Sequence, residues 1–205
     1  MFDDTIAAIL SVGHRLDAGG LAPATSGNYS MRLVDGSIAI TVSGAHKGRL
    51  SPHQIMRVDA KGAALDDKRP SAETLLHTLI YDVDSEAGAV LHTHSVAGTV
   101  LSRALTGHEI CLSGYELLKA FPGVATHETT IALPLVDNTQ DMSALVDELR
   151  PILARQSPLI PAYYIRGHGL YVWGPTLEAA ENLVEACEFL IACAWEEWKA
   201  GRVRS

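Results

Sequence analysis

The chain is poor in cysteine, and its cysteines show no pairing pattern. Cys111, Cys187 and Cys193 are the three cysteines among 205 residues, and none belongs to a Cys-x-x-Cys pair. An odd number in apolar surroundings is typical of small core residues in a reducing compartment, not of a disulfide framework. The acidic residues 3–4 also lack the basic character of a secretory signal. We therefore expect a cytoplasmic protein.

Several other features are missing. No apolar run approaches the roughly 20 residues of a membrane span, so we expect no membrane partner. The formal net charge is -8, basic runs are absent and aromatic residues make up 6% of the chain, which argues against a nucleic-acid surface. Neither a Gly-x-Gly-x-x-Gly sequence after a strand nor a Walker loop is found, which argues against a nucleotide cofactor.

The chain that remains is typical of one folded domain over residues 1–205. Along the chain, segments with the apolar period of a helix are interspersed with segments that predict hairpins. This order favours a mixed sheet covered by helices over a parallel Rossmann sheet. Ser71 is the expected cap of the second helix. We expect helices at 3–17, after 70, and at 96–105, 142–154 and 176–199, a helical turn at 115–121, and strands at 29–34, 37–42, 55–58, 63–65, 90–94, 110–112, 130–133, 163–165 and 170–173.

Two histidines mark one buried strand as a candidate metal site. His92 and His94 flank Thr93, and because side chains alternate along a strand, both imidazoles project to the same face. His168 lies between two glycines that allow close backbone approach. Three imidazoles with an open fourth position are typical of catalytic zinc. A single His-x-His pair often binds no metal, so this interpretation depends on the remaining motifs.

Three loops rich in small polar residues could surround an anion. Hydroxyls, an amide and glycine N–H groups can form an anion nest, and a helix start can add its own N–H groups. The same residue types also build ordinary turns. The candidate phosphate-binding residues are Thr25, Ser26, Gly27, Asn28, Ser43, Gly44 and Ser71, with Lys47 as the source of positive charge.

Taken together, these segments resemble the class II aldolase/adducin family. The matching segments are residues 23–28, 43–47, 70–73, 92–94 and 166–169, in the expected order over nearly the whole chain. The resemblance implies a three-layer α/β/α sandwich with a mixed, largely antiparallel central sheet. It implies one zinc ion per subunit on His92, His94 and His168, and a homotetramer with active sites near subunit interfaces.

Within the family, residues 115–119, 126–128, 137–138 and 167–174 are most similar to the dehydratases of methionine salvage. That similarity implies zinc-dependent dehydration of a phosphorylated ketose, 5-methylthioribulose 1-phosphate, to 2,3-diketo-5-methylthiopentyl 1-phosphate. It assigns the acid–base role to Glu116, for which we expect a largely water-excluded setting and a raised pKa. Glu73 matches the carboxylate that the family aldolases use.

Other functions stay open at this point. An aldolase would share the metal, the phosphate site and Glu73, and an epimerase or a decarboxylase could use the same scaffold. A non-enzymatic adducin-like module would have no use for an open metal site. The remaining histidines lack a paired-ligand context, and we expect no role in the site for His14, His46, His53, His77, His108 and His127. His127 differs from the others in belonging to a Thr-His-Glu segment that recurs in the resembled dehydratase branch.

Overall fold

The computed structural model describes residues 2–201. Eight strands form one sheet in the order β3-β2-β1-β4-β8-β7-β6-β5. All neighbouring strands are antiparallel except β6 and β7, which are parallel. The strands are β1 (Asn28–Arg32), β2 (Ile38–Thr41), β3 (Ile55–Val58), β4 (Ala89–Thr93), β5 (Glu109–Ser113), β6 (Thr130–Val136), β7 (Ala162–Ile165) and β8 (Gly169–Gly174).

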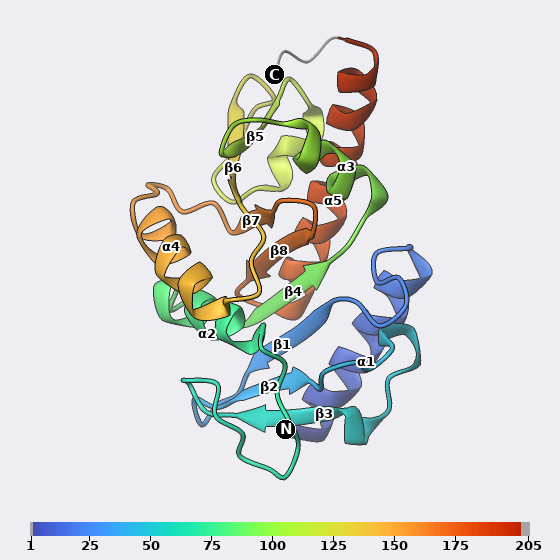
Figure 1. Cartoon of the computed structure of the whole chain (residues 1–205), viewed down its shortest axis with the longest axis vertical. Coiled ribbons are helices and arrows are strands. Elements are labelled where there is room, and N and C mark those ends of the chain that lie inside the picture. The colour runs from blue at the N-terminus through green and yellow to red at the C-terminus, as the bar shows by residue number, and fades with distance from the viewer. Residues whose placement is uncertain (1, 202–205) are drawn as a thin grey trace.

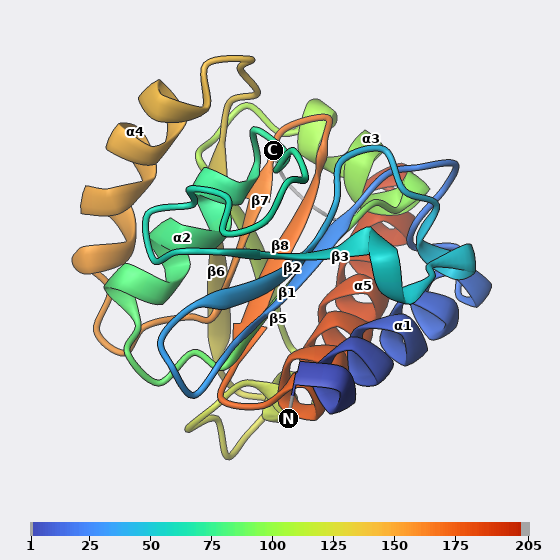
Figure 2. The ribbon, with the colours of Figure 1, turned by 90° about the horizontal axis from the view of Figure 1, so that it is seen from below.

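Helices cover both faces of this sheet, as Figure 2 shows. One face packs against α1 (Phe2–Ala18), α3 (Val96–Ala104) and α5 (Leu177–Lys199), and the other against α2 (Thr74–Val83) and α4 (Met142–Ala154). The sheet runs from β3 to β5 along the length of the molecule (Figure 1). The fold is therefore the expected three-layer α/β/α sandwich with a mixed, largely antiparallel sheet.

The central strand β4 shows why the layers form. All of its residues are buried, and successive side chains enter opposite cores. Leu91 packs in the core beneath α1 and α5, whereas Val90 packs in the core beneath α2 and α4. The alternation that separates these two side chains also points His92 toward α2 and Thr93 toward α5.

Most expected elements are present, with two corrections at their boundaries. The helix expected to begin with Ser71 as its cap begins instead at Thr74, and Glu73 occupies the cap position. Ser71 lies in the preceding turn, where its hydroxyl accepts a hydrogen bond from the Glu73 backbone N–H at 3.3 Å. The strand expected at 63–65 is a single bridge between Val58 and Ala64. Within residues 2–201, none of the helices is long and apolar enough to cross a membrane.

Candidate metal centre and substrate pocket

Three strands bring the histidines together. His92 is in β4 and His94 follows the end of that strand, while His168 lies in the turn that joins β7 to β8. β4 pairs directly with β8, which places this turn beside the end of β4. Gly169 permits the approach, because a Cβ atom there would lie 2.3 Å from the Thr93 carbonyl oxygen. Glycine at position 169 is thus a requirement of local packing.

The three imidazoles have the geometry of a metal site. One ring nitrogen from each of His92, His94 and His168 lies within 4.8 Å of the others. His92 Nδ1 bonds the Leu170 carbonyl oxygen at 2.9 Å, which leaves Nε2 for the site. That Nε2 atom is buried and has no hydrogen-bond partner among the described residues. A buried polar atom without a partner is costly, and a metal ion would satisfy it.

The electrostatics favour the form of histidine that binds metal. Burial lowers the pKa of His94 to about 4, and burial also lowers the pKa of His92 well below its usual value. Both imidazoles are therefore neutral near pH 7, as metal coordination requires. Three neutral imidazoles fit zinc as a donor set.

Glu73 is the carboxylate nearest to the three histidines. Its Oε1 lies 3.2 Å from His168 Nε2, and its Oε2 lies 3.9 Å from His92 Nε2. Asn28 donates a short hydrogen bond to Oε2. Burial would raise the pKa of Glu73, but the hydrogen bond with His168 and the interaction with His92 outweigh it and hold the pKa well below its usual value. Glu73 is therefore an ionised group beside the candidate metal position.

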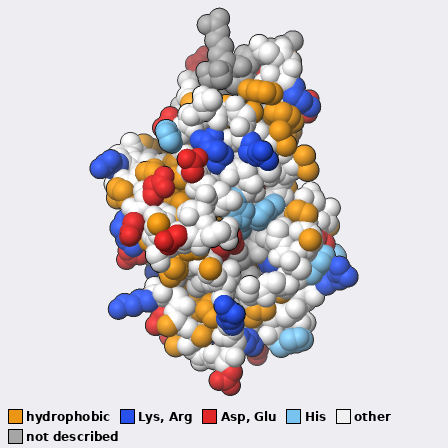
Figure 3. Space-filling view, viewed as in Figure 1, with side chains coloured by type: hydrophobic (Ala, Val, Ile, Leu, Met, Phe, Trp, Pro, Cys, Tyr) orange, Lys and Arg blue, Asp and Glu red, His pale blue; other side chains and the backbone are white. Residues whose placement is uncertain are grey.

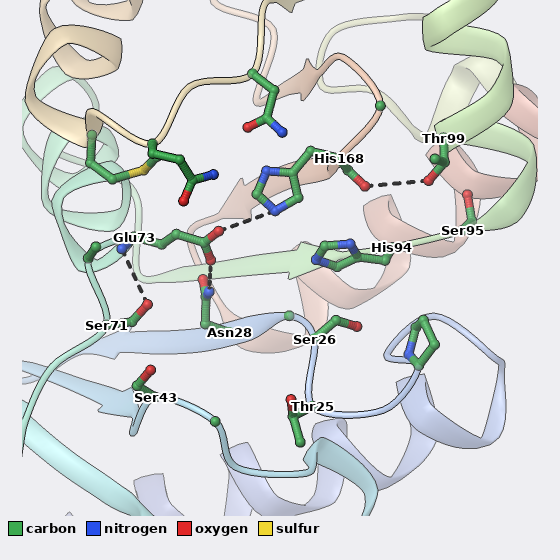
Figure 4. A pocket seen from close by; sticks show the side chains of 18 of the residues that line it. Thr25, Ser26, Asn28, Ser43, Ser71, Glu73, His94, Ser95, Thr99 and His168 are labelled. Carbon is green, nitrogen blue, oxygen red and sulfur yellow. Dashed lines mark hydrogen bonds and ion pairs between the residues drawn. The ribbon is translucent and has the colours of Figure 1, made fainter.

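A pocket of about 1110 Å³ joins these groups to the polar loops. Gly27 and Gly44 have φ angles of 77° and 73°, conformations that glycine adopts without strain. Figure 4 shows Thr25, Ser43 and Ser71 along one side of the pocket, with Glu73, His94 and His168 across from them. In the space-filling view, histidine side chains reach the surface at a hollow near the middle of the face (Figure 3). Of the sequence-predicted residues, Thr25, Ser26, Gly27, Asn28, Ser43, Gly44, Ser71, Glu73, His94 and His168 all line it.

Lys47 does not take the position expected of it. Its side chain is buried, and Nζ donates hydrogen bonds to the carbonyl oxygens of Thr25 and Ala45. Lys47 therefore joins the two polar loops from behind and does not line the pocket. Arg69, which the sequence analysis missed, is the single Lys or Arg among the described residues that line it. Its only sequence signal is that it directly precedes Pro70 and Ser71.

Glu116 also departs from the expected setting. Its side chain is 72% exposed, bonds Lys119 and lies 3.5 Å from His127 Nδ1. The hydrogen bond with Lys119 lowers the pKa of Glu116, whereas a raised pKa was expected. Glu116 lies in the connection between β5 and β6, and two strands, β7 and β6, separate β5 from β8, the neighbour of β4 that begins at the Gly-His-Gly turn. The chain does not bring Glu116 into its own pocket.

Other lining residues had no predictive sequence pattern. Val96 and Val100 lie one turn apart on α3 and contribute apolar surface. Val96 is 82% exposed and Val100 is 38% exposed. Asn138, Thr139 and Gln140 line the pocket from the loop between β6 and α4. Such loop residues carry no periodicity, so only their spatial position reveals them.

Comparison with known proteins agrees with this architecture. A family model described as "Class II Aldolase and Adducin N-terminal domain" matches residues 7–195. A solved structure of l-fuculose-1-phosphate aldolase from Thermus thermophilus superposes with a TM-score of 0.76 at 25% identity, covering 100% of both chains.

Two curated relatives are similar over most of their length. The methylthioribulose-1-phosphate dehydratase of Gluconacetobacter diazotrophicus is 51% identical over 196 residues, which cover 95% of this chain and 94% of the relative. The methylthioribulose-1-phosphate dehydratase of Granulibacter bethesdensis is 53% identical over 194 residues, covering 92% of this chain and 89% of the relative. By its family match, its fold and these relatives, the chain belongs to the class II aldolase and adducin family.

Proposed function

We propose that the protein is a zinc-dependent hydro-lyase that converts 5-methylthioribulose 1-phosphate to 2,3-diketo-5-methylthiopentyl 1-phosphate in methionine salvage, in the cytoplasm. Two relatives that share about half of its residues carry the corresponding dehydratase name. The observation that carries the proposal is one pocket lined by His94, His168, Glu73 and the polar loops, with His92 clustered behind the other two histidines.

Zinc would be held by His92, His94 and His168. When bound there, zinc supplies Lewis acidity that polarises a substrate carbonyl and stabilises the negative charge that develops on it. The hydrogen bond between His92 Nδ1 and the Leu170 carbonyl oxygen fixes the orientation of the His92 ring. Tyr171 stacks on the same ring with centroids 4.0 Å apart, so His92 is held from two sides.

The substrate phosphate would bind at the polar loops. Gly27 and Gly44 present backbone N–H groups without a Cβ, and Ser71 lies in the turn that precedes α2. Arg69 would supply the positive charge, since it lines the pocket and Lys47 does not. Lys47 supports the site indirectly, because its ammonium joins the backbone of the two loops.

The remote end of the proposed substrate is apolar, and the pocket offers a matching wall. Val96 and Val100 present apolar side chains from the first two turns of α3. A methylthio group loses contact with water when it packs against such side chains, which stabilises the complex. We assign this wall to the methylthio group.

The reaction needs a base at C3 and an acid at the C4 hydroxyl. Glu73 is ionised and lies beside the histidines, so we assign it the removal of the C3 proton. Loss of the C4 hydroxyl, with a proton added to it, releases water, and the resulting enol takes up a proton at C4 to give the diketone. We assign the donor role to Glu116 of a neighbouring subunit, because Glu116 is exposed and distant from its own pocket. This assignment requires an oligomer, for which we propose a homotetramer.

A class II aldolase is the second candidate. Glu73 lines the pocket as an aldolase would require, and the same histidines and loops would serve. Aldol cleavage breaks the bond between C3 and C4, whereas dehydration keeps it.

The proposed function is tested by incubating the purified zinc protein with 5-methylthioribulose 1-phosphate and identifying the products by mass spectrometry. A product lighter than the substrate by one water supports the dehydratase. Two fragments with no dehydrated product would support the aldolase. Parallel assays of Glu73→Gln and Glu116→Gln should each lose about 10²-fold or more in turnover if both carboxyl groups transfer protons.

A further inference from the structure

A ladder of buried polar side chains lies behind Glu73. Asn28 and Ser30 project from the same face of β1, because they are two residues apart on a strand. Glu73, His77 and Tyr81 are spaced four residues apart, from the cap of α2 to its last turn, and share one face of it. The strand and the helix meet along these two rows.

The contacts of the ladder are continuous. Asn28 donates to Glu73 Oε2, and Asn28 Oδ1 forms a short hydrogen bond with His77 Nε2. His77 Nδ1 lies 2.7 Å from Ser30 Oγ, which in turn lies 2.9 Å from the Tyr81 hydroxyl oxygen. His77 and Ser30 are fully buried, so water does not compete for these bonds.

The placement of the Asn28 amide sets the direction of the bonds in the ladder. Its Nδ2 donates to Glu73 Oε2, and its Oδ1 faces His77 Nε2. The Asn28 carbonyl oxygen then needs a donor, which places the single proton of neutral His77 on Nε2. His77 Nδ1 must therefore accept from the Ser30 hydroxyl, and Ser30 accepts from Tyr81. Burial lowers the pKa of His77 to about 4, so the ring carries one proton near neutrality.

We propose that His77 is a positioning residue for catalysis, which holds the Asn28 amide in the one orientation that donates to Glu73. With Asn28 fixed, Glu73 Oε2 is restrained and Oε1 stays 3.2 Å from His168. A flipped amide would instead turn its carbonyl oxygen against the carboxylate, and like partial charges would push Glu73 away. This inference rests on the proposed function only because that function assigns to Glu73 the removal of the C3 proton of the substrate.

The surroundings of His77 explain why an apolar residue would not serve. An apolar side chain would leave the Asn28 carbonyl oxygen buried without a donor, which is unfavourable for a polar atom that has lost its water. The same oxygen could recover a partner only by rotation of the amide. His77 also packs edge-on against Tyr171, with ring centroids 5.8 Å apart, and Tyr171 stacks on His92. Substitutions must therefore be checked for zinc content.

Two matched variants test the role. His77→Leu fills space without a donor, whereas the side-chain amide of His77→Gln can donate to Asn28 and accept from Ser30. We expect both to retain zinc, His77→Leu to lose about 10²-fold in kcat with little change in KM, the scale of a misplaced catalytic group, and His77→Gln to recover most of that loss. Unchanged kcat in His77→Leu, an equal loss in both variants, or loss of zinc would overturn the proposal.

The protonation pattern of the wild-type protein gives a readout that does not depend on turnover. Nitrogen-15 NMR of histidine-labelled wild-type protein, with His77→Gln to assign the signal, should show His77 protonated at Nε2 and unprotonated at Nδ1 at neutral pH. A proton on Nδ1, or on both nitrogens, would overturn the ladder. Failure of the wild-type protein to dehydrate the substrate would instead contradict the proposed function and leave this NMR result standing.

Discussion

The position of Glu116 predicts that activity can be restored between two inactive subunits. Glu116 is exposed and far along the sheet from its own pocket, so we assign it to the pocket of a neighbouring subunit. Glu116→Gln removes the proton donor and keeps the side-chain shape, and turnover should fall by about 10²- to 10⁴-fold. His94→Ala removes one of the three proposed metal ligands and should abolish turnover. A mixed oligomer of the two variants contains some pockets with intact histidines facing an intact Glu116.

The expected size of the recovery follows from random assembly. In an oligomer assembled from equal amounts, half of the pockets keep His94, and half of those face a subunit with Glu116. Activity should therefore reach about one quarter of the wild-type value in closed symmetric assemblies. Co-expression of the variants with two different affinity tags, followed by tandem purification and a steady-state assay, measures this recovery.

A matched pair supplies the control. His94→Ala and Glu73→Gln affect groups that line the same pocket of one subunit, so their mixed oligomer has no intact pocket and should stay inactive. The reasoning is refuted if the Glu116→Gln and His94→Ala mixture shows no recovery, or if the control mixture recovers equally.

Three further outcomes are expected. His168→Ala should sharply reduce zinc content in elemental analysis, because one of three imidazole ligands is lost; full occupancy would remove His168 from the site. Val100→Ser should raise KM for 5-methylthioribulose 1-phosphate roughly 5- to 10-fold and leave KM for ribulose 1-phosphate, which lacks the methylthio group, unchanged. Equal changes in the two KM values would refute the assignment of this wall to the methylthio group. The pKa of His77 is depressed from 6.5 to about 4 in the folded state, so as pH falls the unfolded chain takes up the proton first. Denaturant titrations of metal-free protein should therefore show up to about 3 kcal/mol of stability lost between these pH values, and His77→Gln should flatten this dependence.

The cluster of three histidines could be predicted because its signal is local. A His-x-His pair in an apolar strand has a fixed geometry, since alternation alone puts His92 and His94 on one face. The glycines that flank His168 marked it as a candidate. Gly169 is indeed at a close approach, because a Cβ atom at this position would lie 2.3 Å from the Thr93 carbonyl oxygen. The helix at Met142–Ala154 was likewise fully specified by its apolar period.

The departures concern side chains whose environment depends on distant residues. Lys47 lies between two polar loops, and nothing local shows that its ammonium turns toward the carbonyl oxygens behind them. Glu116 precedes two leucines, which indicated burial, but the 3-10 helix Glu116–Ala120 buries Leu118 and leaves Glu116 in solvent. His77 meets partners 47 and 49 residues away in the sequence, so no spacing pattern could distinguish it from a core histidine.

The fate of the C3–C4 bond tests the central claim most directly. The zinc protein would be given 5-methylthioribulose 1-phosphate labelled with carbon-13 at C3 and C4, and the reaction followed by NMR. Dehydration predicts a product in which C3 has become a ketone carbon, C4 a methylene carbon, and the one-bond coupling between them persists. Loss of that coupling, with the two labels in separate molecules, would contradict the account and establish aldol cleavage.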